Sequence, residues 1–159
     1  MQSWAQERFA AASVAHLATV TAAGHPHLVP VVFTLVEDTV WTAVDHKPKT
    51  TRALRRLANI EAHPRVSLLA DHYDDDWSRL WWVRADGDAA VVALPGDDAT
   101  AGLSALVAKY PQYGADLPTG PLIRITVDAW RSWSAGLGAA RSGQWPGMTS
   151  PRFRGAAPV

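Results

Sequence analysis

The chain has 159 residues, of which 48% are hydrophobic and 19% are charged, and its 15 basic and 15 acidic residues give a formal net charge of zero. This composition is typical of one soluble globular domain, and the neutral balance argues against a general nucleic-acid or membrane-surface binder, which usually carries a net positive field. The absence of cysteine excludes disulfides, thiolate metal sites and a cysteine nucleophile.

The N-terminal stretch MQSWAQERFAAASVAHLATV does not have the pattern of a signal peptide. It lacks a basic region, and Gln6, Glu7 and Arg8 interrupt its apolar residues. No apolar run in the chain approaches the length that is needed to cross a bilayer. We therefore expect a cytoplasmic protein whose partners include neither a membrane nor a nucleic acid.

The chain begins with a predicted helix and two predicted strands. Residues 3–13 have the pattern of a short amphipathic helix, and Ser3 is a suitable N-cap. Residues 14–22 and 27–36 predict two β-strands on either side of a Gly-Pro turn. Pro30 has no N–H to donate to a neighbouring strand, so it indicates an edge strand or a bulge.

A third strand is predicted at 39–44, which makes 14–44 an expected antiparallel meander. Residues 50–62 predict a helix with an apolar stripe, and Pro64 ends it because the residue before proline avoids the α conformation. A fourth strand is predicted at 65–71.

The second half of the chain continues as strands with one further helix. Its predicted elements are, in order, a loop at 72–78, one long strand at 79–94 with a bulge at Gly87 (or two strands), a helix at 97–110 capped by Asp97 or Asp98, a loop at 111–121, and one or two closing strands at 122–134.

The order of these elements predicts the fold class. The strands come in consecutive runs instead of alternating with helices, which favours a mainly β fold, an antiparallel barrel or sandwich with peripheral helices. We assign 1–135 to this domain. Residues 136–159 are rich in Gly, Ala, Pro, Ser and Arg, and we predict a weakly ordered tail there.

The stretch DHKPKTTRALRR (45–56) concentrates positive charge between a predicted strand and a predicted helix. The N-terminus of a helix suits a phosphate or carboxylate, because its N–H groups are unpaired and its dipole is positive there. Lys47 and Lys49 oppose that dipole, which suggests an anionic ligand. The alternative is a solvated basic turn that pairs with nearby aspartates.

Two other segments could carry a site. DHYDDDW (71–77) offers carboxylates to a hard metal ion, but the spacing of a calcium loop is absent, so we expect a solvated or ion-paired turn and no metal site. In WSRLWW (77–82), strand geometry would put Arg79 and Trp81 on one face and Leu80 and Trp82 on the other. One of these faces would belong to the core. The aromatic side chains of the other face would pack between the subunits of a dimer or bind a flat ligand.

No known catalytic pattern is present elsewhere. The six histidines show no metal-ligand spacing, and the sequence has no GxSxG, Walker or GxGxxG motif. A catalytic residue is therefore not assigned.

Taken together, HLATVTAAGHPHLVPVVF and TVWTAVDHKPKTTRALRRLANIEAHPRVSLLADHYDDDWSRLWWVRADGDA resemble the pyridoxamine 5′-phosphate oxidase-like flavin-binding split barrels. The likeness spans roughly 10–134 and is strongest to the actinobacterial branch that uses the deazaflavin coenzyme F420. It implies an antiparallel split β-barrel, an obligate homodimer, and two cofactors in the grooves between the subunits.

The resemblance also implies cofactor-binding residues. The basic turn would hold the cofactor phosphate with Lys47, Lys49, Thr50 and Arg52. One strand would run alongside the cofactor at Thr42, Ala43 and Val44, and another would approach its ring by the backbone of Pro30, Val31 and Val32. Trp77 would come from the partner subunit.

The implied activity is an F420-dependent oxidoreductase that transfers a hydride between the reduced deazaflavin and a small organic substrate. In such enzymes the cofactor supplies the chemistry and the protein supplies binding and orientation, which accounts for the missing catalytic motif. Two alternatives stay open: an FMN-dependent oxidase or reductase of the same fold, and a non-enzymatic flavin- or haem-binding protein. A haem binder would use His16, His27 or His46.

Overall fold

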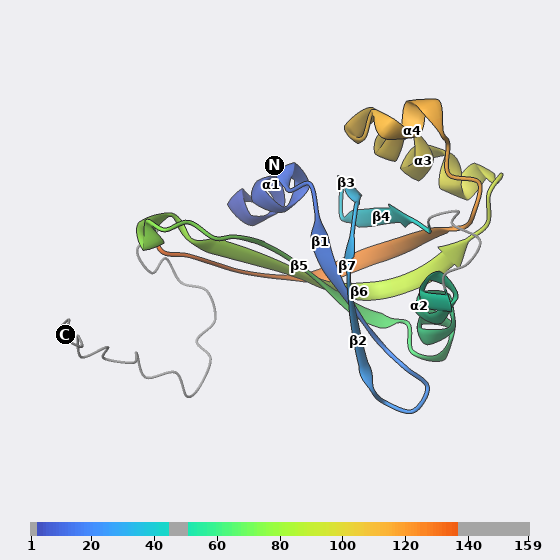
Figure 1. Ribbon diagram of the computed structural model, residues 1–159, viewed down its shortest axis with the longest axis horizontal. Helices are drawn as coiled ribbons and strands as arrows, with labels where there is room; N and C mark the ends of the chain where they lie inside the picture. The colour runs from blue at the N-terminus through green and yellow to red at the C-terminus, as the bar shows by residue number, and fades with distance from the viewer. Residues whose placement is uncertain (1–2, 45–50, 137–159) are drawn as a thin grey trace.

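The computed structural model describes residues 3–44 and 51–136, without the side chains of 51–54. In this part of the chain seven strands form one antiparallel sheet, accompanied by helices (Figure 1). The elements are α1 (Trp4–Ala11), β1 (Ala15–Val20), β2 (Pro26–Val31), β3 (Thr34–Val36), β4 (Thr39–Ala43), α2 (Thr51–Ala62), β5 (Arg65–His72), the 3-10 helix η1 (Trp77–Arg79), β6 (Trp81–Val92), α3 (Asp97–Lys109), α4 (Gln112–Ala115) and β7 (Leu122–Ser134).

The strand order β2-β1-β5-β6-β7-β4-β3 forces the sheet to curl. Strands β2 and β3 are its two edges, yet only Val32 and Phe33 connect them. Because consecutive Cα atoms are 3.8 Å apart, the ends of these two strands lie within about 11 Å of each other. The sheet therefore bends into a half-barrel, which confirms the predicted mainly β, split-barrel fold.

The expected meander over 14–44 is wrong in its middle connection. Strand β1 does pair with β2, and β3 with β4, both antiparallel. The run 27–36, however, was predicted to be one strand, and it is divided between β2 and β3, which lie at opposite edges of the sheet. The edge position of β2 agrees with the prediction from Pro30, which faces His16 across the β1–β2 pair.

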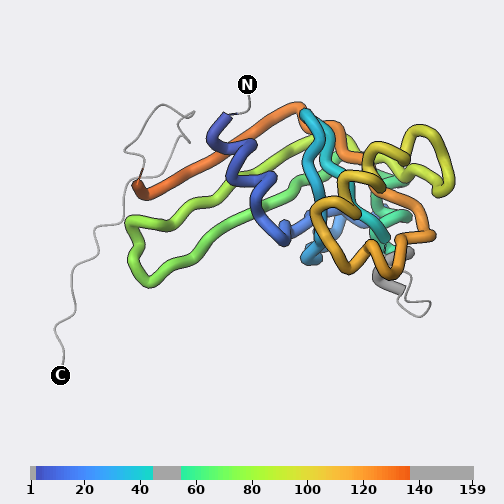
Figure 2. The backbone as a smooth tube through the Cα atoms, turned by 90° about the horizontal axis from the view of Figure 1, so that it is seen from above, coloured from blue at the N-terminus to red at the C-terminus, as the bar shows by residue number. Residues whose placement is uncertain are grey.

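Strands β5, β6 and β7 are long and extend beyond the barrel as a projecting arm (Figure 2). Strand β6 is a single strand whose register to β7 shifts between Asp86 and Gly87, so the bulged-strand alternative is confirmed. A Cβ atom on Gly87 would lie closer than 3.0 Å to backbone atoms of Thr126, which explains the glycine at this bulge.

The two faces of this sheet differ in character. The inner face, which carries Leu17 of β1, Leu68 of β5 and Ala85 of β6, is buried in the main core. The outer face carries the alternating residues, including Leu69 and Arg84. Helix α1 covers the inner face, where the Phe9 ring centroid lies 5.2 Å from that of Trp130 in an edge-on contact.

Helix α1 begins as predicted. The Ser3 hydroxyl accepts a hydrogen bond from the Gln6 N–H, and the Gln6 side chain accepts one from the Ser3 N–H, at 3.3 and 2.8 Å. This reciprocal capping box satisfies two N–H groups that a helix start leaves unpaired.

Helix α3 packs against β3 and β4 over a second hydrophobic cluster, in which Trp41 and Leu106 are buried. Its N-cap is Gly96, without a side-chain cap, so the predicted capping by an aspartate is wrong. Helix α4 is a short element within the expected loop 111–121.

Two further predictions need correction or comment. Residues 77–79 form η1, and β6 begins at Trp81, so the proposed strand alternation starting at Arg79 does not apply. The predicted tail of 136–159 lies almost entirely outside the described residues.

No helix in the described part of the chain is long and apolar enough to span a membrane.

Candidate functional site

The predicted cofactor-binding turn connects β4 to α2. Strand β4 ends at Ala43, where the next N–H, of Val44, donates a hydrogen bond of 3.3 Å to the Pro121 carbonyl, and α2 begins at Thr51. The structure thus has the predicted strand and helix on either side of the basic sequence. Lys47, Lys49 and Thr50 lie outside the described residues, as does the side chain of Arg52.

The strand residues before this turn are buried. Thr42, Ala43 and Val44 are 1%, 6% and 7% exposed. Val44 belongs to the main core, and Ala43 belongs to the cluster beneath α3. The Thr42 hydroxyl oxygen is also buried and has no hydrogen-bond partner among the described residues. The end of β4 therefore belongs to the packed core and leads directly into the basic sequence.

A buried hydrogen bond joins α2 to the sheet. The Asn59 side-chain amide donates to the Thr19 hydroxyl of β1 at 2.9 Å, and both residues are almost fully buried. His27 of β2 lies opposite Thr19 in the β1–β2 register, and its Nδ1 atom is buried without a partner in the described chain. This bond anchors α2, and with it the helix start that follows the basic turn.

Pro30, Val31 and Val32 lie where β2 ends and crosses to β3. Pro30 is exposed, Val31 is buried at 6% exposure, and Val32 is half-buried. These three residues and the end of β4 belong to the barrel. The backbone of the crossing is held by Tyr110, whose hydroxyl accepts a hydrogen bond of 3.1 Å from the Phe33 N–H.

Trp77 lies elsewhere. It is in η1, at the far end of the arm formed by β5, β6 and β7, and its side chain is 63% exposed. In Figure 1 this end of the arm is on the opposite side of the molecule from α2. Within one protomer, the structure does not bring Trp77 together with the other predicted cofactor-binding residues.

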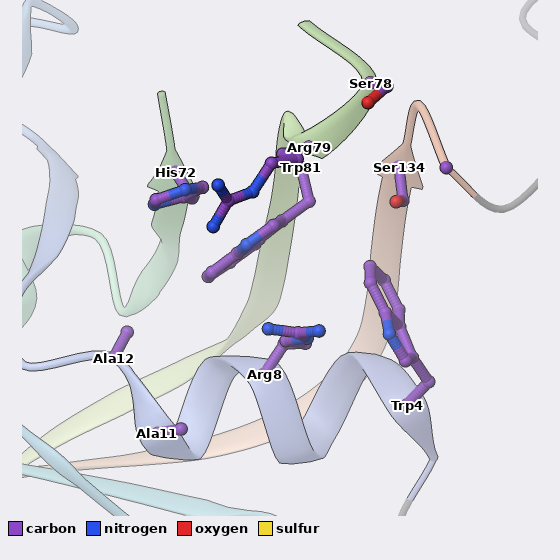
Figure 3. A pocket seen from close by; sticks show the side chains of 10 residues that line it. Trp4, Arg8, Ala11, Ala12, His72, Ser78, Arg79, Trp81 and Ser134 are labelled. Atoms are coloured by element: carbon purple, nitrogen blue, oxygen red, sulfur yellow. The ribbon is translucent and has the colours of Figure 1, made fainter. Parts of the chain in front are cut away.

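A cavity of about 610 Å³ lies at the arm, between α1 and the ends of β5, β6 and β7 (Figure 3). Its side chains come from two sources: Trp4 and Arg8 from α1, and the arm residues that face α1. The lining residues are Trp4, Arg8, Ala11, Ala12, His72, Ser78, Arg79, Trp81, Ser134 and Gly136.

Aromatic and cationic groups alternate in this cavity. The Arg8 guanidinium lies 6.0 Å from the Trp4 ring centroid and 5.9 Å from that of Trp81, distances at which a cation is attracted to a ring face. The His72 ring stacks on Trp81 with centroids 6.1 Å apart and an angle of 18° between the planes. Figure 3 shows Arg8 between the two tryptophans.

The acidic loop beside the cavity is engaged in local contacts. Asp74 lies 3.4 Å from Arg79 and 3.6 Å from His72. Asp76 accepts hydrogen bonds from the Ser78 hydroxyl and N–H at 2.7 and 3.0 Å, and these bonds lower the pKa of the Asp76 carboxyl. No group of three or more potential metal ligands occurs among the described residues.

Sequence reasoning did not find this cavity. Trp4 and Arg8 are about 70 positions from Trp81, and no local pattern links them. The unusual number of tryptophans, eight in 159 residues, was the available signal. The high number of tryptophans indicated that aromatic contact surfaces exist, but it did not indicate which tryptophans lie close together in the fold.

A curled seven-stranded antiparallel sheet with few helices defines the class, a split β-barrel. The family model of pyridoxamine 5′-phosphate oxidase matches residues 2–134. The chain therefore belongs to the pyridoxamine 5′-phosphate oxidase family, as the sequence resemblance suggested.

Solved structures share this fold at low sequence identity. A conserved hypothetical protein from Mycobacterium tuberculosis is 22% identical, with a TM-score of 0.66 over 92% of this chain and 94% of the other. HutZ, a heme storage protein from Vibrio cholerae, is 18% identical, with a TM-score of 0.61 over 82% and 88%. An FAD-binding protein from Mesorhizobium loti is 16% identical, with a TM-score of 0.61 over 79% and 87%.

A comparison with curated proteins found no match. The similar structures thus establish the fold, and their names include both a flavin binder and a heme binder.

Proposed function

We propose that this protein is an F420-dependent oxidoreductase, in which the turn between β4 and α2 binds the phosphate of the deazaflavin. The observation that carries the proposal is the position of this turn. Its sequence contains Lys47 and Lys49, it follows a buried strand, and it leads into a helix of 12 residues whose first turn contains no acidic residue. Positive charge at a helix start favours a bound phosphate.

The choice of F420 over FMN is supported by the charge that continues along α2. F420 carries an anionic glutamyl tail beyond its phosphate, and Arg55 and Arg56 follow the turn within α2. Arg55 is exposed and Arg56 is half-buried. Arg55, an exposed arginine about one turn after the start of α2, could bind such a tail. FMN has no glutamyl tail, so it would not need Arg55.

The resemblance also supports a homodimer with a cofactor in each groove between subunits, and the outer face of the sheet fits this arrangement. Exposed apolar side chains lie on that face, including Leu28, which is 65% exposed, and Trp133, which is 47% exposed. In a dimer, the arm of one subunit would extend toward its partner, and Trp77 would then contribute to the partner's cofactor site.

The proposal is tested by separate titrations of the purified protein with F420, FMN and haemin, followed by tryptophan fluorescence. We expect F420 to bind most tightly. Lys49→Ala should weaken F420 at least tenfold, which corresponds to about 1.4 kcal/mol. Arg55→Ala should weaken F420 but leave FMN unchanged.

Glu37→Gln is the control, because Glu37 is an exposed charged residue in the turn between β3 and β4, outside the face proposed for the dimer, and we expect this variant to bind F420 like the wild type. An affinity of Lys49→Ala within threefold of the wild type would contradict the phosphate assignment. Binding of FMN alone would favour an FMN-dependent enzyme of the same fold. Binding of haemin alone would favour a non-enzymatic haem-binding protein.

A further inference from the structure

We call the cavity between α1 and the arm the slot. Figure 3 shows the indole rings of Trp4 and Trp81 on its two sides, the Arg8 guanidinium between them at one end, and Ser134 toward the other end. A volume of about 610 Å³ is within the range of small-molecule sites, roughly 300–1,000 Å³. Two indole side chains in one cavity suit a ligand with an aromatic ring, because aromatic rings pack favourably against one another.

The charge of the slot selects an anion. Every ionisable side chain that lines it is basic: Arg8, His72 and Arg79. Arg79 already lies close to Asp74, but no carboxylate of the described residues forms an ion pair with Arg8. The Arg8 guanidinium can therefore offer its planar pair of N–H donors to a carboxylate.

The chain's own C-terminal sequence does not match this charge. Gly136 lines the cavity, and the 23 residues after it include Arg141, Arg152 and Arg154 but no aspartate or glutamate. A sequence of this composition supplies no side-chain carboxylate for Arg8. Charge complementarity thus favours a separate anionic molecule.

We propose that this slot binds an aromatic monocarboxylate, with its ring against the indole side chains of the slot and its carboxylate on Arg8. Within one subunit the slot lies at the arm, which is on the opposite side of the molecule from α2 (Figure 1). In the dimer proposed above, Trp77 of η1 would reach the partner's cofactor site, and Ser78 and Arg79 of the same η1 line the slot. Competition with F420 and FMN therefore decides whether the slot is separate from that site.

The test is isothermal titration calorimetry of the full-length protein with 2-naphthoate, and with 2-naphthylmethanol as a neutral analogue. We expect 2-naphthoate to bind at one site per chain and the alcohol to bind at least tenfold more weakly. Arg8→Gln should weaken 2-naphthoate at least tenfold and bring its affinity close to that of the alcohol.

Arg131→Gln is the control, because Arg131 lies on the opposite face of β7 from Ser134, and its affinity should equal that of the wild type. Ser134→Leu places bulk in the slot without changing charge, and it should weaken both ligands. Circular dichroism and thermal melting establish that each variant is folded. If Arg8→Gln fails to fold, Ser134→Leu and the comparison of the two ligands still decide the question.

Four results would overturn the proposal: no saturable binding of 2-naphthoate, equal affinity for the alcohol, unchanged affinity in folded Arg8→Gln, or one-for-one displacement of 2-naphthoate by FMN or F420. The last result would assign the slot to the cofactor. F420 binding is measured separately. Failure of 2-naphthoate to bind would not contradict the F420 proposal, and failure of F420 to bind would not contradict the proposal for the slot.

Discussion

Lys109 shows how one side chain can connect elements that are distant in sequence. Its ammonium group donates hydrogen bonds to the Ala10 and Ala12 carbonyls, at 2.9 and 2.8 Å, where α1 ends. It also lies 4.1 Å from the centroid of the Phe33 ring. The last four carbonyls of a helix have no partner within the helix, so Lys109 stabilises both this helix end and its position on the sheet.

Replacement of Lys109 by methionine should destabilise the protein. Methionine keeps an apolar chain of similar length but cannot donate the two hydrogen bonds, which leaves carbonyls at the end of α1 without their partner. We expect the free energy of unfolding at pH 7 to fall by about 1.5 kcal/mol, measured by urea denaturation. Lys109→Arg, which keeps charge and donors, should recover part of that loss.

The same residue predicts a pH dependence. Burial lowers the pKa of Lys109 to about 8 from its ordinary value of 10.5. Between these two pH values the unfolded chain keeps this proton and the folded chain loses it, so stability must rise with pH. The wild type should therefore gain stability relative to Lys109→Met from pH 8 to pH 10 and not below pH 8. A constant difference across that range would contradict the lowered pKa.

At the scale of elements, the packing of α3 on β4 depends on a glycine. Gly102 is in the middle of α3, where alanine is usually more favourable by about 1 kcal/mol. A Cβ atom at this position, however, would lie closer than 3.0 Å to three atoms of the Trp41 side chain, which is buried. The glycine allows the helix to approach the indole directly.

Gly102→Ala should therefore destabilise the protein, opposite in sign to its effect on an isolated helix. We expect a loss of about 2 kcal/mol, the order of magnitude for overpacking a core, measured as a lower denaturation midpoint. Gly114→Ala in α4 is a suitable control, because no atom lies within 4 Å of the position a Cβ would take. If Gly102→Ala were as stable as the wild type, the close packing of α3 on Trp41 would be contradicted.

At the scale of the whole molecule, α3 covers the outer face of the sheet at β4, whereas the outer face of the arm keeps exposed apolar side chains in the described part of the chain. Trp82 and Trp133 are opposite each other across β6 and β7, and Leu69 lies on the same face. Their alternation with buried inner residues places them together on one exposed surface. Contiguous exposed apolar side chains of this kind often form a protein–protein interface.

We expect multi-angle light scattering to give twice the chain mass of 17.2 kDa. Trp133→Glu should weaken the dimer on the order of fiftyfold, because burial of roughly 100 Å² of indole contributes about 2.5 kcal/mol. Leu117→Glu, at an exposed residue in a loop, should leave the dimer intact. A monomeric wild type would remove the basis for cofactor sites shared between subunits.

Local patterns predicted most of the individual elements correctly. The cap at Ser3, the helix that ends before Pro64 and the bulge at Gly87 all depend on neighbours within a few residues, and all three are present. The basic turn was likewise placed correctly between its strand and helix. These features could be predicted because the physical constraints that produce them act over one or two turns of the backbone.

The sequence by itself thus determined the family, the mainly β class and the position of the basic turn, since these follow from the order of local patterns. Only the tertiary structure decided that β2 and β3 lie at opposite edges, that Gly102 meets Trp41, and that Arg8 lies between two tryptophans. The physical reason is the curling of the sheet. It brings together residues that are far apart in the chain, and no short-range periodicity records which of them will meet.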